Sequence, residues 1–298
     1  MNKPLILVTG ASGKTGQPVV RQLLERGYPV RALVHRLDER SQRLADLGAE
    51  VVAGDFLNLD SVRRAMKGVQ RVYFCYPPLD GLLKAATNLA IAARDEGVEG
   101  LVNMSQISAR EHTKSALAFQ HWQSEQILDW AGIGASHINP TFFAEDLYLF
   151  TGQSILEEGK MVLPFGEGKH APVAAEDIAR VVAGILEDPQ PHAGQHYFIS
   201  GPKNMKMTEI AEVLSSQLGR PIEYVDLPIE HWQQALKEKT DFPHFLVSHL
   251  GAVAQDHQEG VFSGVSDVVE RIGGKAPQSL ENFISANPEA FGVRPVRL

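Results

Sequence analysis

The chain has few of the features that mark secreted, membrane-spanning or nucleic-acid-binding proteins. It contains a single cysteine, Cys75, among 298 residues, so no disulfide can form within the chain, and we expect a reducing, cytoplasmic location. No apolar run approaches the roughly 18 residues that span a bilayer. The N-terminus lacks the charged region and the cleavage site of a signal peptide. We therefore expect no membrane association.

Stretches rich in lysine and arginine are also missing. The formal net charge is −8, and such a surface repels phosphate backbones, so we expect no direct nucleic-acid binding. Hydrophobic residues make up 44% and charged residues 21% of the chain, as in an ordinary globular protein. The partner that we expect is a small-molecule substrate, and a homodimer is a hypothesis for the assembly.

The most informative feature that is present lies near the N-terminus. The apolar run over residues 5–8 leads into a loop with Gly10, Gly13 and Gly16 three residues apart, and a helical pattern follows at once. This order presents a helix N-terminus to a phosphate. One glycine makes the turn, one lets backbone amides approach a pyrophosphate, and one lets helix and strand pack closely. The alternative is a structural turn without a ligand. The predicted cofactor-binding residues of this loop are Gly10, Ser12, Gly13, Lys14, Thr15 and Gly16.

Apolar runs alternate with helical patterns up to about residue 140. Further strands are predicted at 30–34, 51–53, 71–76, 100–105 and 136–139. Helices are predicted at 41–47, 61–66, 82–96 and 117–131, with Asp60 as the cap of the second of these. The alternation predicts an α/β fold, a Rossmann-like doubly wound parallel sheet. A ligand of such a sheet lies beyond the carboxyl ends of its strands.

Beyond Pro140 the pattern is less regular. We predict a smaller, mostly helical C-terminal lobe, interrupted at Pro243, at Gly251 and at Gly273-Gly274. The predicted domains are an NAD(P)-binding Rossmann domain over residues 1–155, to which 172–200 return, and a substrate-binding lobe over 156–298.

Arg36 follows the second predicted strand, about twenty residues after the last glycine of the loop. NAD sites usually place an acid there, for the ribose 2′-hydroxyl. A guanidinium suits a 2′-phosphate instead, so we predict that NADP(H) is preferred over NAD(H). Arg40 and Arg43 would add to the same field. The alternative is that Arg36 is only a solvated surface charge.

Two further segments at strand ends are assigned to the cofactor. Asp55 and Phe56 follow the third strand, where the carboxylate would accept from the adenine amino group and the ring would bound the base. Tyr76 and Pro77 follow the fourth strand and would border the ribose. Asp55 has an alternative role as the organiser of a loop, because Gly-Asp is a common turn pair.

The Tyr-x-x-x-Lys pair of short-chain dehydrogenases is absent, because none of the six tyrosines has a lysine four residues later. The chain has instead His121-Trp-Gln-Ser-Glu125, followed by a strand ending in Asn139-Pro140. This order resembles the NmrA-like, atypical branch of the short-chain dehydrogenase/reductase superfamily over about residues 5–230, and it is similar to that of its quinone and triphenylmethane reductases. Two departures are Asn139, where arginine is usual, and Leu117, which takes the place of the superfamily tyrosine.

The resemblance implies hydride transfer from NADPH to a quinone-like or conjugated aromatic acceptor, which needs little help from a protein acid. His121 would lie near the nicotinamide and orient the acceptor or protonate the product; its alternative is a structural helix residue. Ser105 matches the superfamily serine, and Pro140 is assigned to the cofactor. Phe142 and Phe143 would stack on the acceptor, although one of them is expected to be core.

One alternative function stays open at this point. Some members of this branch are dinucleotide-sensing regulators without turnover, which is the second hypothesis for function. No metal site is expected, because the only histidines four residues apart, His192 and His196, have Gly194 between them and no third ligand at metal-site spacing.

Overall fold

The computed structural model describes residues 3–291, and these fall into two compact units. The first unit takes in residues 3–139, Ala175–Phe198 and Glu270–Gly274, and the second takes in Pro140–Ala174, Ile199–Val269 and residues 275–291. The predicted boundary at residue 155 falls inside the helix over 144–158 and leaves most of that helix in the dinucleotide domain. In the structure this helix is in the second unit, because it packs against the strand that follows it.

A seven-stranded sheet forms the centre of the first unit, in the order β3-β2-β1-β4-β5-β6-β9. The pairings from β3 through β6 are all parallel, which confirms the predicted doubly wound sheet. The order reverses between β1 and β4, and this is where such sheets bind their ligands. The strands are β1 (Ile6–Val8), β2 (Val30–Val34), β3 (Glu50–Ala53), β4 (Arg71–Phe74), β5 (Gly100–Met104), β6 (Ala135–Pro140) and β9 (His196–Ile199).

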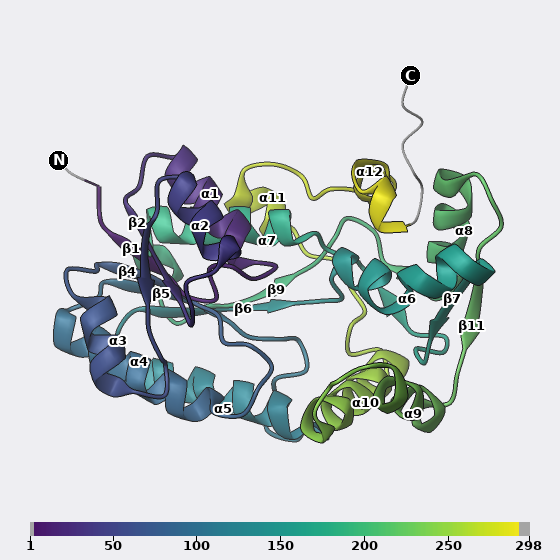
Figure 1. The fold of residues 1–298 in the computed structure, drawn as a ribbon, viewed down its shortest axis with the longest axis horizontal. Coiled ribbons are helices and arrows are strands. Elements are labelled where there is room, and N and C mark those ends of the chain that lie inside the picture. Colours follow the sequence, from purple (N-terminus) through teal and green to yellow (C-terminus); the bar gives the residue numbers. More distant parts are fainter. Residues whose placement is uncertain (1–2, 292–298) are drawn as a thin grey trace. The chain divides into compact units, whose positions relative to one another are not determined.

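Helices cover both faces of this sheet (Figure 1), with α1, α2 and α7 on one face and α3, α4 and α5 on the other. Their apolar stripes are buried on the strands, as expected for a sheet covered on both sides. The helices are α1 (Gly16–Glu25), α2 (Glu39–Asp46), α3 (Leu59–Met66), α4 (Leu82–Glu96), α5 (Ala116–Trp130) and α7 (Ala175–Glu187), with the short η1 (Gln190–His192).

Polar side chains define where several of these helices begin. Asp38 caps α2 and Ser115 caps α5. The predicted cap of α3, Asp60, is wrong, because Asn58 accepts from the N–H of Ser61 and Asp60 lies in the first helical turn. An acid in a first turn is still favourable, since it faces the positive end of the helix dipole.

The second unit is mostly helical and has two small sheets, a parallel pair β7-β11 and an antiparallel pair β8-β10. The predicted break at Gly251 is wrong: α10 continues through it, because the glycine packs closely against the Gln233 side chain. The elements are α6 (Ala144–Glu158), β7 (Lys160–Leu163), β8 (Lys169–His170), β10 (Met205–Lys206), α8 (Met207–Leu218), β11 (Glu223–Asp226), α9 (Ile229–Lys239), α10 (His244–Gln258), α12 (Leu280–Ala286) and η2 (Pro288–Phe291), and α11 (Val268–Gly273) belongs to both units.

The described residues contain no helix with the length and apolar character needed to cross a membrane.

Candidate dinucleotide site

The glycine loop follows β1 at the point where the strand order reverses. Gly10 has φ of +56°, and a Cβ at this position would lie 3.0 Å from the carbonyl oxygen of Cys75, at the end of β4. At Gly16 a Cβ would lie only 2.1 Å from the carbonyl oxygen of Gly10. The tight return of the chain from β1 into α1 therefore requires glycine at both positions.

Hydrogen bonds join the glycine loop to the end of β4. Thr9 Oγ1 donates to the Cys75 carbonyl at 3.1 Å and accepts from the Cys75 N–H at 2.8 Å. The hydroxyl of Tyr73 donates to Thr15 Oγ1 at 2.9 Å. Burial raises the pKa of Tyr73 well above its usual value and also raises that of the Cys75 thiol, so both side chains are neutral here. The Thr15 side chain therefore supports the loop through Tyr73, and it also lies 3.8 Å from the Cys75 sulfur.

The N-terminus of α1 has no side-chain cap in the described structure, and its first turn contains no acid. Amide groups at an uncapped helix start attract an anion, and the helix dipole adds to the attraction. A close-packed glycine turn that leads into an open helix N-terminus fits the diphosphate of a dinucleotide.

Arg36 lies two residues beyond the end of β2 and is exposed. Within the described part of the chain it has no ion pair. The neighbouring acid, Asp38, is engaged elsewhere: its carboxylate caps α2 through the N–H groups of Arg40 and Ser41 and pairs with the Arg40 guanidinium at 2.8 Å. The Arg40 side chain lowers the pKa of Asp38. The positive charge of Arg36 is therefore not neutralised by an adjacent carboxylate.

The loops after β3 and β4 meet through an aromatic contact. Phe56 lies edge-on to Tyr76, with ring centroids 6.1 Å apart, and also contacts Phe74. The Tyr76 hydroxyl donates to the carbonyl of Asp80 at 2.9 Å, and Pro77 is exposed. Asp55 accepts from the N–H of Leu57 at 2.8 Å, so one carboxylate oxygen organises the loop, as the alternative interpretation expected.

The residues predicted for chemistry come from β5 and α5. Ser105 follows β5 directly; its Oγ and that of Ser108 are buried, and among residues 3–291 neither has a hydrogen-bond partner. Buried hydroxyls without a partner are uncommon and call for a ligand or a water. His121 is buried on α5 and is 9% exposed. Leu117 is core, at 1% exposed.

Asn139, the departure from the usual arginine, forms a specific link. Its side-chain amide donates to Glu125 Oε1 at 3.0 Å and to the carbonyl of Gln106 at 3.2 Å. Glu125 is almost fully buried, at 2% exposed. Asn139 therefore joins the end of β6 to α5 and to the segment after β5, a role that the sequence alone left in doubt.

The two phenylalanines after Pro140 differ within the second unit. Phe142 is 4% exposed, and its ring lies between 5.6 and 6.0 Å from those of Phe165, His170 and His257. Phe143 is half-buried at the start of α6. Phe142 is therefore the core member of the pair that the sequence led us to expect. Pro140 is buried at the end of β6.

Sequence reasoning missed Tyr73, Ser108 and the link from Asn139 to Glu125. The Tyr73 bond and the Asn139 link depend on contacts between segments that are distant along the chain, and the burial of Ser108 depends on the fold, so no spacing along the chain reveals them. The one available signal was position: Ser108 lies just beyond a strand end that was already assigned to the site.

Comparison with known proteins agrees with this geometry. The model of the NmrA-like family matches residues 2–284. An NAD(P)H azoreductase from Xenophilus azovorans is 30% identical over 289 residues, which cover 97% of this chain and 100% of the relative.

Two solved structures share the fold. A quinone oxidoreductase of Escherichia coli complexed with NADPH has a TM-score of 0.84 at 24% identity, covering 95% of this chain and 99% of that one. A Citrobacter sp. triphenylmethane reductase complexed with NADP(H) has a TM-score of 0.82 at 24% identity, covering 94% and 99%. The resemblance predicted from the motifs is confirmed: the chain belongs to the NmrA-like family.

Proposed function

We propose that this protein is an NAD(P)H-dependent oxidoreductase that transfers a hydride to a quinone-like or conjugated aromatic acceptor. The observation that carries the proposal is the glycine loop at the switch point of the sheet, followed by the uncapped start of α1. It is supported by the full-length relative named as an NAD(P)H azoreductase. Bound NAD(P)H supplies the hydride; the tasks of the chain are binding, orientation and proton handling.

The backbone of residues 10–16 binds the diphosphate. Arg36 favours the 2′-phosphate of NADPH over the 2′-hydroxyl of NADH, and its exposure and the pairing of Asp38 with Arg40 support this assignment. Phe56 and Tyr76, joined edge to face, border the adenosine together with Pro77 and the remaining oxygen of Asp55.

On the reactive side, we assign the buried hydroxyl of Ser105, after β5, and the imidazole of His121, on α5. His121 orients the acceptor or protonates the reduced product, and Ser105 has a minor role in positioning. Pro140 remains a predicted cofactor residue, and half-buried Phe143 remains the predicted acceptor residue. Phe142 is a core residue of the second unit. A delocalised acceptor accepts a hydride without a strong protein acid, which is consistent with the missing Tyr-x-x-x-Lys pair.

Steady-state assays test this function. They follow the loss of NADPH absorbance with a panel of quinones, azo dyes and triphenylmethane dyes. We expect turnover with at least one class of acceptor, and faster turnover with NADPH than with NADH. Tight binding of NADPH without turnover on any acceptor would contradict the proposal and favour a dinucleotide-sensing regulator.

A further inference from the structure

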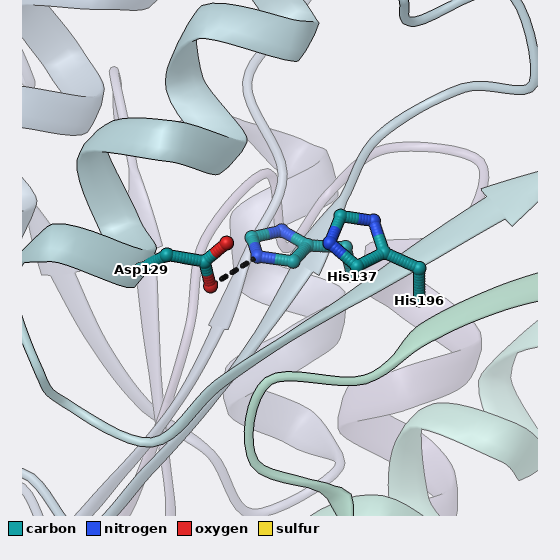
Figure 2. A group of neighbouring side chains, drawn as sticks. All are labelled: Asp129, His137 and His196. Carbon is teal, nitrogen blue, oxygen red and sulfur yellow. Dashed lines mark hydrogen bonds and ion pairs between the residues drawn. The ribbon is translucent and has the colours of Figure 1, made fainter.

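We propose that the first unit contains a second, separate site, a binding site for a divalent transition-metal ion formed by Asp129, His137 and His196. These residues come from α5, β6 and β9 and converge on one place, as Figure 2 shows. One ligand atom from each lies within 4.8 Å of the other two. Two imidazoles and one carboxylate are a donor set typical of zinc, iron, nickel or cobalt, whereas magnesium and calcium prefer oxygen ligands.

One of the three separations already nearly suits an ion, and His196 must turn, since its ring centroid lies 4.6 Å from that of His137 and the ring planes are 32° apart. His137 Nε2 lies 3.0 Å from Asp129 Oδ1. Ligand atoms about 2.0–2.2 Å from a tetrahedral zinc ion are about 3.3–3.6 Å apart, so this pair would have to separate by only about 0.3–0.6 Å. The His196 side chain is 46% exposed and has room to turn toward the other two. His137 is fully buried and fixes the position of the site.

The second ring nitrogen of each histidine has a polar partner. His137 Nδ1 lies 3.1 Å from Asn103 Nδ2. An imidazole that binds a metal through Nε2 carries its proton on Nδ1, so the site requires that the Asn103 amide turn over and accept that proton with its oxygen. His196 Nδ1 lies 3.7 Å from Glu125 Oε2. Such outer contacts orient metal-binding imidazoles and leave Nε2 directed at the ion. Both imidazole rings therefore have a polar contact at the nitrogen that would not bind the ion, which a chance group of three polar side chains would not need.

The position of Asp129 supplies an independent reason for a cation. Asp129 lies in the last turn of α5, and that turn contains no basic residue. A carboxylate at the negative end of a helix is unfavourable unless a positive charge offsets it. A bound ion would do so, and it would clamp the end of α5 to β6 and β9. The separation of the ligands along the chain explains why spacing alone predicted no metal site.

Calorimetric titration of the untagged protein with Zn²⁺ tests the site, with Mg²⁺ as the comparison ion. We expect one Zn²⁺ per chain, no heat with Mg²⁺, and a rise in the thermal midpoint with Zn²⁺, since an ion that binds only the folded state stabilises it. Asp129→Asn and His196→Gln should each weaken Zn²⁺ binding by about 100-fold or more, and Glu125→Gln by about tenfold.

The control is His231→Ala, which removes an exposed histidine on α9 and should leave binding unchanged. Circular dichroism and the metal-free thermal midpoint of each variant show whether it folds. Absence of Zn²⁺ binding by the wild-type chain, or binding of equal strength in folded Asp129→Asn and His196→Gln, would overturn the proposal. These readouts do not depend on NADPH, so the site and the proposed reductase activity can fail independently.

Discussion

The hydroxyl of Tyr73 on β4 donates a hydrogen bond to Thr15 Oγ1 at the start of α1, across 2.9 Å. This bond joins the two sides of the switch point, where the strand order reverses. Both groups are buried, Tyr73 at 0% and Thr15 at 6% exposed. The conformation of the glycine loop therefore depends on a polar contact beneath it as well as on its glycines.

Replacing Thr15 by valine keeps the shape of the side chain and removes the acceptor. The buried Tyr73 hydroxyl would then keep only the weak Cys75 thiol as a partner, and we expect a loss of about 1–3 kcal/mol in the free energy of unfolding, with weaker NADPH binding. Thr15→Ser retains the hydroxyl and should show little of either effect. Urea denaturation and NADPH titration of both variants measure this. Equal behaviour of the valine and serine variants would show that the bond has no such role.

Arg36→Ala should reduce the affinity for NADPH by about tenfold or more, because a hydrogen bond to a charged group contributes about 1.5–3 kcal/mol. The affinity for NADH should not change, since that nucleotide lacks the 2′-phosphate. The matched control is Arg64→Ala, which removes another exposed arginine, on α3. The measurement is the dissociation constant of each variant for NADPH and for NADH. An equal loss of affinity for both nucleotides in Arg36→Ala would contradict a 2′-phosphate contact.

His121→Phe should lower kcat with the best acceptor by about tenfold or more while NADPH affinity stays close to the wild-type value, if the imidazole handles the acceptor or its proton. The variant also removes any pH dependence of kcat that this group causes. An unchanged kcat and an unchanged pH profile in folded His121→Phe would assign the residue to the alternative, structural role.

The second unit should lose stability in acid because of its buried histidines. His257 Nδ1 lies 2.8 Å from His170 Nδ1, and the His257 ring is stacked between Phe165 and Phe262 at centroid distances of 3.8 and 3.6 Å. Burial lowers the pKa of His170 from 6.5 to about 3, and burial together with His170 lowers the pKa of His257 well below 6.5.

Both rings stay neutral in the folded chain while the unfolded chain takes up protons below pH 6.5, so stability falls as the pH drops from 6.5 toward 3. At about pH 5 the loss from His170 alone is about 2 kcal/mol. His170→Phe should lose correspondingly less stability than the wild type between about pH 7.5 and about pH 5, and the exposed-site control His231→Ala should behave like the wild type. Identical pH dependence in all three proteins would refute this origin of acid sensitivity.

The central sheet was predictable from the sequence because each of its signals is local. Strands such as the one within residues 5–8 are continuous apolar runs, and the helices between the strands carry a clear period. Helix α6 was less evident, since Thr151 and Gly152 are weak helix formers. Its buried residues, Ala144, Leu147, Thr151 and Ile155, do recur at helical spacing, so this signal was available.

The residues of the candidate site were predictable only where they lie close together in one segment of the sequence. The glycine loop and the strand ends are such segments, and the structure brings Phe56 and Tyr76 together as a consequence of strand order. The link from Asn139 to Glu125 and the group of Asp129, His137 and His196 depend instead on the register of a helix over neighbouring strands. Spacing along the chain does not encode that register.

Calorimetric titration of the protein with NADPH tests the central claim most directly, with Gly16→Ala as the variant and Gln17→Ala, one exposed residue further along α1, as its control. We predict one NADPH per chain for the wild type and for Gln17→Ala. In Gly16→Ala, the new Cβ would collide with the carbonyl oxygen of Gly10. Binding should be lost or reduced by about 100-fold in Gly16→Ala, since the amides would no longer converge on the diphosphate. No heat of binding with either NADPH or NADH in the wild-type protein would contradict the account.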